Sequence, residues 1–306
     1  MANFRVYNIQ LLPNNSREVD IGISGYKRIF ANFRERTNRA RIEKNLLAYH
    51  RDVGKESHFG PHEFHPKAGY IWGRFVRYKR TDKVDDLNTM KPIFQEGRKQ
   101  VGVASLHEMF FIFDCAQHFL AIEEASGALP PTNLFSDILR DYLTPICNEL
   151  FPNHTLCILL IADKNSLDVV LKEALGFSRI EVDIAPPNGE AEDSLEQLKK
   201  SRIQKLSIIG SPGGGGAIAN DLPPFLLGVI KGAVKYGRTQ LSYFRAPAEG
   251  TGDPVKVKYD SATTPMKFEK RKTSSESDED FAERCLEDLR EKVGEISPSS
   301  FVPTEK

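Results

Sequence analysis

Residues 24–41 read SGYKRIFANFRERTNRAR, and residues 68–80 read AGYIWGRFVRYKR. In the first stretch, Tyr26, Ile29, Phe30 and Phe33 recur at the i, i+3, i+4 and i+7 spacing of one helix face. In the second stretch, the side chains are expected to alternate between the two sides of a strand. The two stretches therefore predict a helix that begins with Ser24 as its N-cap and a later strand, both rich in Lys and Arg.

Charge is distributed in blocks along a chain whose 42 basic and 42 acidic residues cancel. Residues 27–80 hold 14 basic and 5 acidic residues, a net charge of +9, whereas residues 108–198 hold 4 basic and 16 acidic residues, a net of −12. Residues 227–272 are again positive, at +6, and residues 276–306 are negative, at −6. A local positive excess in a neutral chain indicates a polyanionic partner such as nucleic acid, although an ordinary solvated surface with uneven charge stays open.

The predicted nucleic-acid-binding residues come from the helix, the strand and a second basic cluster near residue 270. On the strand, Tyr70, Trp72 and Arg74 share one side, and such interleaving of rings and bases is typical of surfaces that bind single-stranded nucleic acid. The alternative, in which Tyr70 and Trp72 belong to the core, stays equally open. The full predicted set is Lys27, Arg28, Arg34, Arg36, Arg39, Arg41, Tyr70, Trp72, Arg74, Arg77, Arg80, Lys267, Lys270, Arg271 and Lys272.

Several classes of protein are disfavoured by the composition. Four widely spaced cysteines without a CxxC pair argue against a disulfide framework or a zinc ribbon. The first residues lack the apolar region of a signal peptide, and the apolar run near residues 225–230 is too short to span a membrane. We expect a cytoplasmic protein with no membrane association and no cofactor.

No catalytic motif is present, because GxSxG, HExxH and Walker sequences are all missing. His58, His62 and His65, with Glu63, suggest metal ligands, but Gly60 and Pro61 prevent the helix that a zincin motif needs, so an ordinary polar loop and no metal are expected. Glu181 and Asp183 share one side of a predicted strand. They keep open the alternative of a metal-dependent nuclease, while the absence of a catalytic set favours a protein that is not an enzyme.

The periodicities predict an α+β protein with mixed sheets and flanking helices, in two domains followed by a C-terminal helix. The expected boundaries are a basic region over residues 1–104, an α/β body over 105–272 with an apolar helix at 223–236, and a linker and acidic helix over 273–306. The other expected elements are strands at 4–12, 155–161, 179–184, 203–209, 239–244, 254–259 and 265–270, a hairpin at 108–123, and helices at 133–142, 166–175 and 194–202.

The C-terminal helix contains an apolar seam at alternating four- and three-residue spacing. A seam of this kind predicts docking on the chain itself or pairing with a second copy. We therefore expect a homo-oligomer, most simply a dimer, and a protein-interaction module remains a further alternative. The predicted oligomerisation residues are Leu286, Leu289, Val293 and Ile296.

The hairpin FFIFD (110–114) with HFLAIE (118–123), and the helix NLFSDIL (133–139), resemble corresponding stretches of the phage-exclusion proteins of the lambda RexA type. The run from Leu195 to Ile208 and the strands from Gln240 to Glu269 are similar as well. Length and the basic first hundred residues also resemble the BstA-type prophage abortive-infection proteins. The resemblance spans residues 105–290 and offers no catalytic residue. It implies a prophage-encoded, cytoplasmic, oligomeric DNA-binding protein that protects the host population against a second phage.

Overall fold

The computed structural model describes residues 1–15, 18–85, 88–89, 91–95, 102–185, 203, 205–247 and 252–295. It confirms the α+β class. The chain divides into two compact units. The first unit contains Met1–Phe4, Ile21–Leu150 and Glu269–Leu286, and the second contains Arg5–Asp20, Phe151–Phe268 and Glu287–Lys306.

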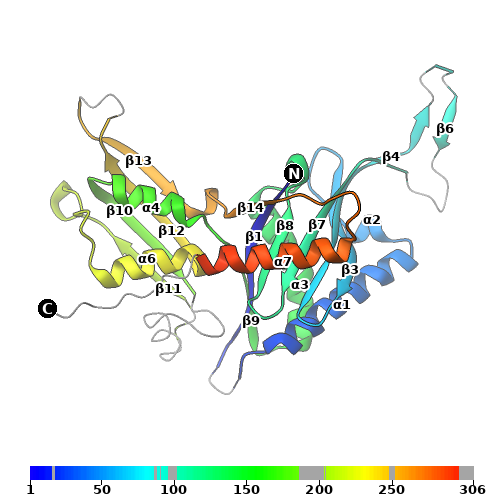
Figure 1. The fold of residues 1–306 in the computed structure, drawn as a ribbon, viewed down its shortest axis with the longest axis horizontal. Coiled ribbons are helices and arrows are strands. Elements are labelled where there is room, and N and C mark those ends of the chain that lie inside the picture. Colours follow the sequence, from blue (N-terminus) through cyan, green and yellow to red (C-terminus); the bar gives the residue numbers. More distant parts are fainter. Residues whose placement is uncertain are drawn as a thin grey trace. The chain divides into compact units, whose positions relative to one another are not determined.

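In the first unit, strands pair in the antiparallel order β8-β7-β4-β3-β2, and a small hairpin, β5–β6, follows β4 (Figure 1). Long β4 and β7 form the centre of this sheet, with register from Tyr70–Asp114 to Thr81–Gly102. The elements that lie within this unit are α1 (Gly22–Ile42), α2 (Leu46–Tyr49), β2 (Arg51–Asp52), β3 (Ser57–Pro66), β4 (Tyr70–Thr81), β5 (Lys83–Asp85), β6 (Pro92–Gln95), β7 (Gly102–Asp114), β8 (Phe119–Glu123) and α3 (Thr132–Leu150).

Helices cover both faces of this sheet, and the side chains of β4 alternate between these two faces. Helix α1 packs on one face, where the rings of Phe30 and Phe113 stack at 4.4 Å. The start of α7 (Asp278–Glu295) covers the other face, where the Phe281 ring meets the Phe110 ring edge-on at 5.2 Å. The side chains of β4 therefore divide between two buried layers, so its aromatic residues lie in the core.

The histidine-rich segment is strand β3, so the expectation of a polar loop is wrong. Residues 57–66 pair with β4, with a bulge between Pro61 and Glu63. Strand β2 pairs only with His58 and Phe59, so among the described residues no strand covers the outer side of 61–66. Pro61 and Pro66 lack backbone N–H groups and so suit a sheet edge that no further strand pairs with.

The second unit contains the antiparallel sheet β11-β10-β12-β13, together with strand β9, which pairs with β1 from Tyr7–Leu160 to Pro13–His154. The apolar helix expected at 223–236 is α6, and it packs on β10 and β12. Within the described ranges, no helix is long and apolar enough to cross a lipid bilayer. The remaining elements are β1 (Ala2–Pro13), β9 (His154–Leu160), α4 (Lys164–Glu173), β10 (Gly176–Ile184), β11 (Leu206–Gly210), α6 (Pro224–Tyr236), β12 (Gly237–Arg245), β13 (Val255–Asp260) and β14 (Lys267–Lys270).

The domain boundary expected between residues 104 and 105 falls inside β7, which pairs along β4, so the basic region is not a separate domain. The helix expected at 194–202 lies outside the described residues.

Helix α4 provides a test of local structure in the second unit. Asp163 is its N-cap and accepts a hydrogen bond from the Asn165 backbone N–H at 3.1 Å. Replacing Asp163 with alanine is expected to lower the free energy of unfolding by about 1 kcal/mol, because an orphan N–H of the first turn loses its acceptor. Urea unfolding of both proteins measures the difference. An unchanged midpoint would show that the cap contributes nothing.

Candidate nucleic-acid interface

Three cations at seven-residue spacing lie on one flank of α1, and we call Lys27, Arg34 and Arg41 the α1 basic flank. Arg41 donates a hydrogen bond to the His62 carbonyl on the open edge of β3. Lys27 lies close enough to Cys115 for its charge to act on that thiol, whose pKa burial raises to about 12. Cys115 in turn donates its backbone N–H to the Gly69 carbonyl at 3.1 Å. At about 1.5 Å per residue, the flank extends about 21 Å beside β3 and the β3–β4 turn.

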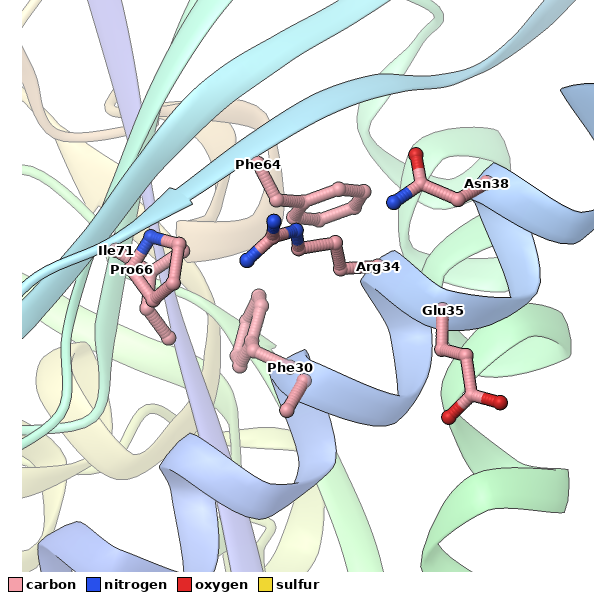
Figure 2. A pocket seen from close by; sticks show the side chains of 8 residues that line it. Phe30, Arg34, Glu35, Asn38, Phe64, Pro66 and Ile71 are labelled. Atoms are coloured by element: carbon pink, nitrogen blue, oxygen red, sulfur yellow. The ribbon is translucent and has the colours of Figure 1, made fainter.

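Arg34, at the middle of this flank, borders a hollow of about 270 Å³ between α1 and β3. Phe30, Phe64 and Ile71 form its apolar floor, and all three side chains are otherwise buried. Figure 2 shows the Arg34 side chain reaching from α1 across the hollow toward Phe64 and Pro66. The volume is near the lower end for small-molecule pockets, so the hollow accommodates one compact group rather than a large cofactor.

The rim of the hollow is positive because the neighbouring acid, Glu35, forms its ion pair away from the hollow. The Glu35 carboxylate points away from the hollow (Figure 2) and pairs with Arg39 at 3.1 Å. Among the described residues, no carboxylate forms an ion pair with Arg34, whose side chain is exposed. Asn38 accepts a hydrogen bond from Arg41 through its side-chain oxygen at 3.3 Å and directs its amide nitrogen toward the hollow. The hollow thus offers donors above an apolar floor.

Tyr70 and Trp72 are core residues, so the expectation that they stack on bases is wrong. Trp72 is 6% exposed and lies between the ring of His65, at 3.9 Å, and the ring of Phe110, at 5.5 Å. Tyr70 is 8% exposed and donates its hydroxyl to Glu283 at 3.3 Å. Helix α7 covers this side of β4, and both rings are held by partners inside the fold.

Arg74 is the centre of an ion-pair network rather than a free phosphate ligand. Its guanidinium contacts Glu63, Glu108 at 3.3 Å and Asp278 at 2.6 Å. Burial alone would lower the pKa of Arg74, but the hydrogen bonds to Asp278 and Glu63 outweigh it and the pKa is raised. Three carboxylates from three distant segments therefore neutralise the Arg74 charge. This corrects the prediction that Arg74 binds nucleic acid.

Most of the other predicted arginines also have acceptors within the fold. Arg36 pairs with Glu149 at 2.6 Å, Arg80 pairs with Asp82 at 3.2 Å, and Arg77 donates to the Ala128 carbonyl at 3.1 Å. The ion pairs of Arg36, Arg80 and Arg39 neutralise charge on the predicted surface, whereas the Arg77 hydrogen bond only holds its side chain in place. Arg28 and Lys267 are exposed and also make contacts of their own.

The second basic cluster does meet the first at one place. Lys270, Arg271 and Lys272 line a pocket of about 450 Å³ together with Arg74. The same pocket contains Glu108, Glu123 and Asp278, and Lys272 pairs with Asp278. The cluster is therefore a pocket of mixed charge, separate in its lining residues from the hollow beside Arg34.

The carboxylates considered for a nuclease are engaged with neighbours. Glu181 pairs with Arg179, while Asp183 accepts a hydrogen bond from Ser207 and pairs with Lys205 at 3.3 Å. Hydrogen bonds from Ser207 and Lys205 hold the pKa of Asp183 below its ordinary value, despite its partial burial. Within the part of the chain that the structure describes, no group of three His, Cys, Asp or Glu side chains is placed to hold a metal ion.

The apolar seam of α7 packs within its own chain. This corrects the prediction that it mediates self-association. Leu286, Leu289 and Val293 are 7%, 0% and 2% exposed. Side chains already covered by their own chain cannot also pair with a second copy. Ile296 lies outside the described residues.

Comparison with known proteins assigns the family. Residues 2–287 match the model of DUF4747, a domain of unknown function, so the chain belongs to the DUF4747 family. No curated protein and no solved structure matches the chain.

Proposed function

We propose that this protein binds single-stranded DNA along the α1 basic flank, without marked sequence preference and without catalysing a reaction. The observation that carries the proposal is the hollow beside Arg34, where an unneutralised guanidinium borders an apolar floor. Single-strand binding proteins combine cations that follow the backbone with apolar or aromatic surface that receives a base. Here the cations would hold phosphates, and the hollow would receive one unpaired base.

Double-stranded DNA fits this arrangement less well. Its bases are paired and stacked inside the duplex, so none is free to enter a hollow on a helix flank. Phosphate contacts of this kind position a strand and do not read its sequence, which accounts for the proposed lack of sequence preference.

The biological role is proposed from the resemblance to phage-exclusion proteins. On this proposal, the protein acts in the cytoplasm as an oligomer and limits a second phage by binding its single-stranded DNA intermediates. Cells that produce Arg34→Ala protein at the wild-type level should lose protection in a plaque assay, and cells that produce Arg39→Ala protein should keep it. Equal protection by both variants would separate defence from binding at α1.

Removing the Arg34 guanidinium is expected to weaken binding of a fluorescein-labelled oligo(dT) about tenfold, because one charge-assisted phosphate contact is lost. The slope of log affinity against log salt should become less negative by about 0.7, the value for one contact with a single strand. Fluorescence anisotropy over a salt series measures both quantities.

Arg39→Ala is the matched control, because Arg39 is an exposed arginine on the same helix that already pairs with Glu35. A second variant, Ala31→Leu, fills the hollow from its α1 wall without changing any charge. It should weaken oligo(dT) binding and leave the salt slope unchanged. The proposal fails if Arg34→Ala and Arg39→Ala bind alike, or if a duplex of the same length binds as tightly as oligo(dT).

A further inference from the structure

The pocket that contains Arg271 and Glu123 has no part in the proposed interface. Its lining residues all belong to the first unit, and its volume of about 450 Å³ is within the range of small-molecule sites. Phe110 and Phe281 provide an apolar wall, Met1 and Ala2 also line the pocket, and charged side chains of both signs provide the rest. A ligand for this pocket therefore needs groups complementary to both kinds of lining.

The cationic side of the pocket lies on the segment that follows β14. Arg271 is exposed, and among the described residues no carboxylate forms an ion pair with its guanidinium. Its backbone carbonyl accepts a hydrogen bond from Arg284 at 3.0 Å, and Arg284 is itself held by Glu276 at 2.6 Å. The main chain that carries Arg271 is thus fixed. Lys270 adds positive charge beside it, so an anionic group of a ligand is favoured here.

The acceptor side of the pocket is the Glu123 carboxylate at the end of β8. One of its oxygens accepts the Phe110 backbone N–H at 3.2 Å, and the other receives no hydrogen bond from the described residues. Burial raises the pKa of Glu123, which reflects how far water is already excluded around it. An ionised carboxylate only accepts hydrogen bonds, so a ligand must present N–H or O–H donors at this point.

We propose that this pocket binds a nucleoside monophosphate, with the phosphate at Arg271 and Lys270 and the donor edge of the base at Glu123. The base would lie against the small part of the apolar wall that Phe110 and Phe281 present to the pocket. Guanine presents two adjacent donors, its ring N–H and its amino group, and so matches the two oxygens of a carboxylate better than other bases. Guanosine 5′-monophosphate is therefore the preferred ligand.

Isothermal titration calorimetry of the full chain tests this site with guanosine 5′-monophosphate, uridine 5′-monophosphate, guanosine and inorganic phosphate. Guanosine 5′-monophosphate should bind at least about tenfold more tightly than each of the other three, because only it satisfies both sides of the pocket. Arg271→Ala should remove the advantage of guanosine 5′-monophosphate over guanosine. Glu123→Gln should remove the tighter binding of guanosine 5′-monophosphate relative to uridine 5′-monophosphate. The glutamine oxygen can still accept the Phe110 N–H.

Arg39→Ala is the matched control, because Arg39 lines neither this pocket nor the hollow beside Arg34 and already pairs with Glu35. It should leave nucleotide binding unchanged. The proposal is overturned if guanosine 5′-monophosphate does not bind, if inorganic phosphate binds as tightly, or if Arg271→Ala and Glu123→Gln both bind like the wild type.

Discussion

Replacing Arg74 with leucine is expected to lower the free energy of unfolding by about 3 kcal/mol at pH 7. The substitution leaves Glu63, Glu108 and Asp278 facing one another without the guanidinium that joins them. Breaking a buried ion pair by removing one partner costs about 3–5 kcal/mol, and the lower end applies because the Arg74 side chain is 22% exposed. Urea unfolding monitored by circular dichroism measures the change.

Arg39→Leu is the comparison, since an exposed i,i+4 pair contributes at most about 0.5 kcal/mol. Equal losses for the two variants would show that the Arg74 network does not stabilise the first unit. A combined reversal of Arg74, Arg77 and Arg80 to glutamate is consequently a poor test of DNA binding. It would remove binding through loss of the fold, whether or not these arginines touch phosphate.

Acidification from pH 7 to pH 4 is expected to remove about 3 kcal/mol of stability through His50 alone. The ring is buried, its Nδ1 lies 3.0 Å from the Tyr78 hydroxyl, and its Nε2 lies 3.1 Å from the Pro61 carbonyl. A neutral ring that donates from Nε2 and accepts at Nδ1 satisfies both partners. Burial lowers the pKa of His50 from 6.5 to about 4.

The direction of the change in stability with pH follows from proton binding. Between pH 6.5 and pH 4 the unfolded chain binds a proton at His50 that the folded protein does not bind, so stability falls as the pH falls through this range. A shift of this size corresponds to about 3 kcal/mol. His50→Gln retains a donor and an acceptor but does not titrate. The difference in unfolding free energy between the two proteins should therefore change by this amount, and a difference that is constant with pH would refute the assignment.

Sequence periodicity predicted the helices and strands well because the apolar residues along one face of each element determine its type. Tyr26, Ile29, Phe30 and Phe33 are all buried, and their 3.6-residue period gave α1, although the helix begins at Gly22 rather than at the expected cap Ser24. The 108–123 hairpin was likewise confirmed as β7 and β8. Helix α3 continues to Leu150, past Pro145 and well beyond the expected end at residue 142, because its buried face extends to Ile146 and Cys147.

The candidate site was harder to predict because it depends on neighbours from distant segments. No local pattern joins Arg74 to Asp278, which lies 204 residues further along the chain. Trp72 is covered by α7, so alternation on β4 alone could not show that both of its faces are buried. Arg34 was predicted, whereas Asn38, Phe64 and Ile71 were missed as members of its site. The available signal was the seven-residue spacing of Lys27, Arg34 and Arg41, which placed them on one flank.

Photochemical cross-linking locates the residues that contact a bound single strand. Oligo(dT) irradiated at low salt with the full chain joins to residues that contact its bases, and mass spectrometry of the digest maps them. Binding at the α1 basic flank predicts cross-links within residues 27–41 and 62–71, and their loss in Ala31→Leu. Cross-links confined to the second unit, or an unchanged map in Ala31→Leu, would contradict binding of a single strand at the α1 basic flank.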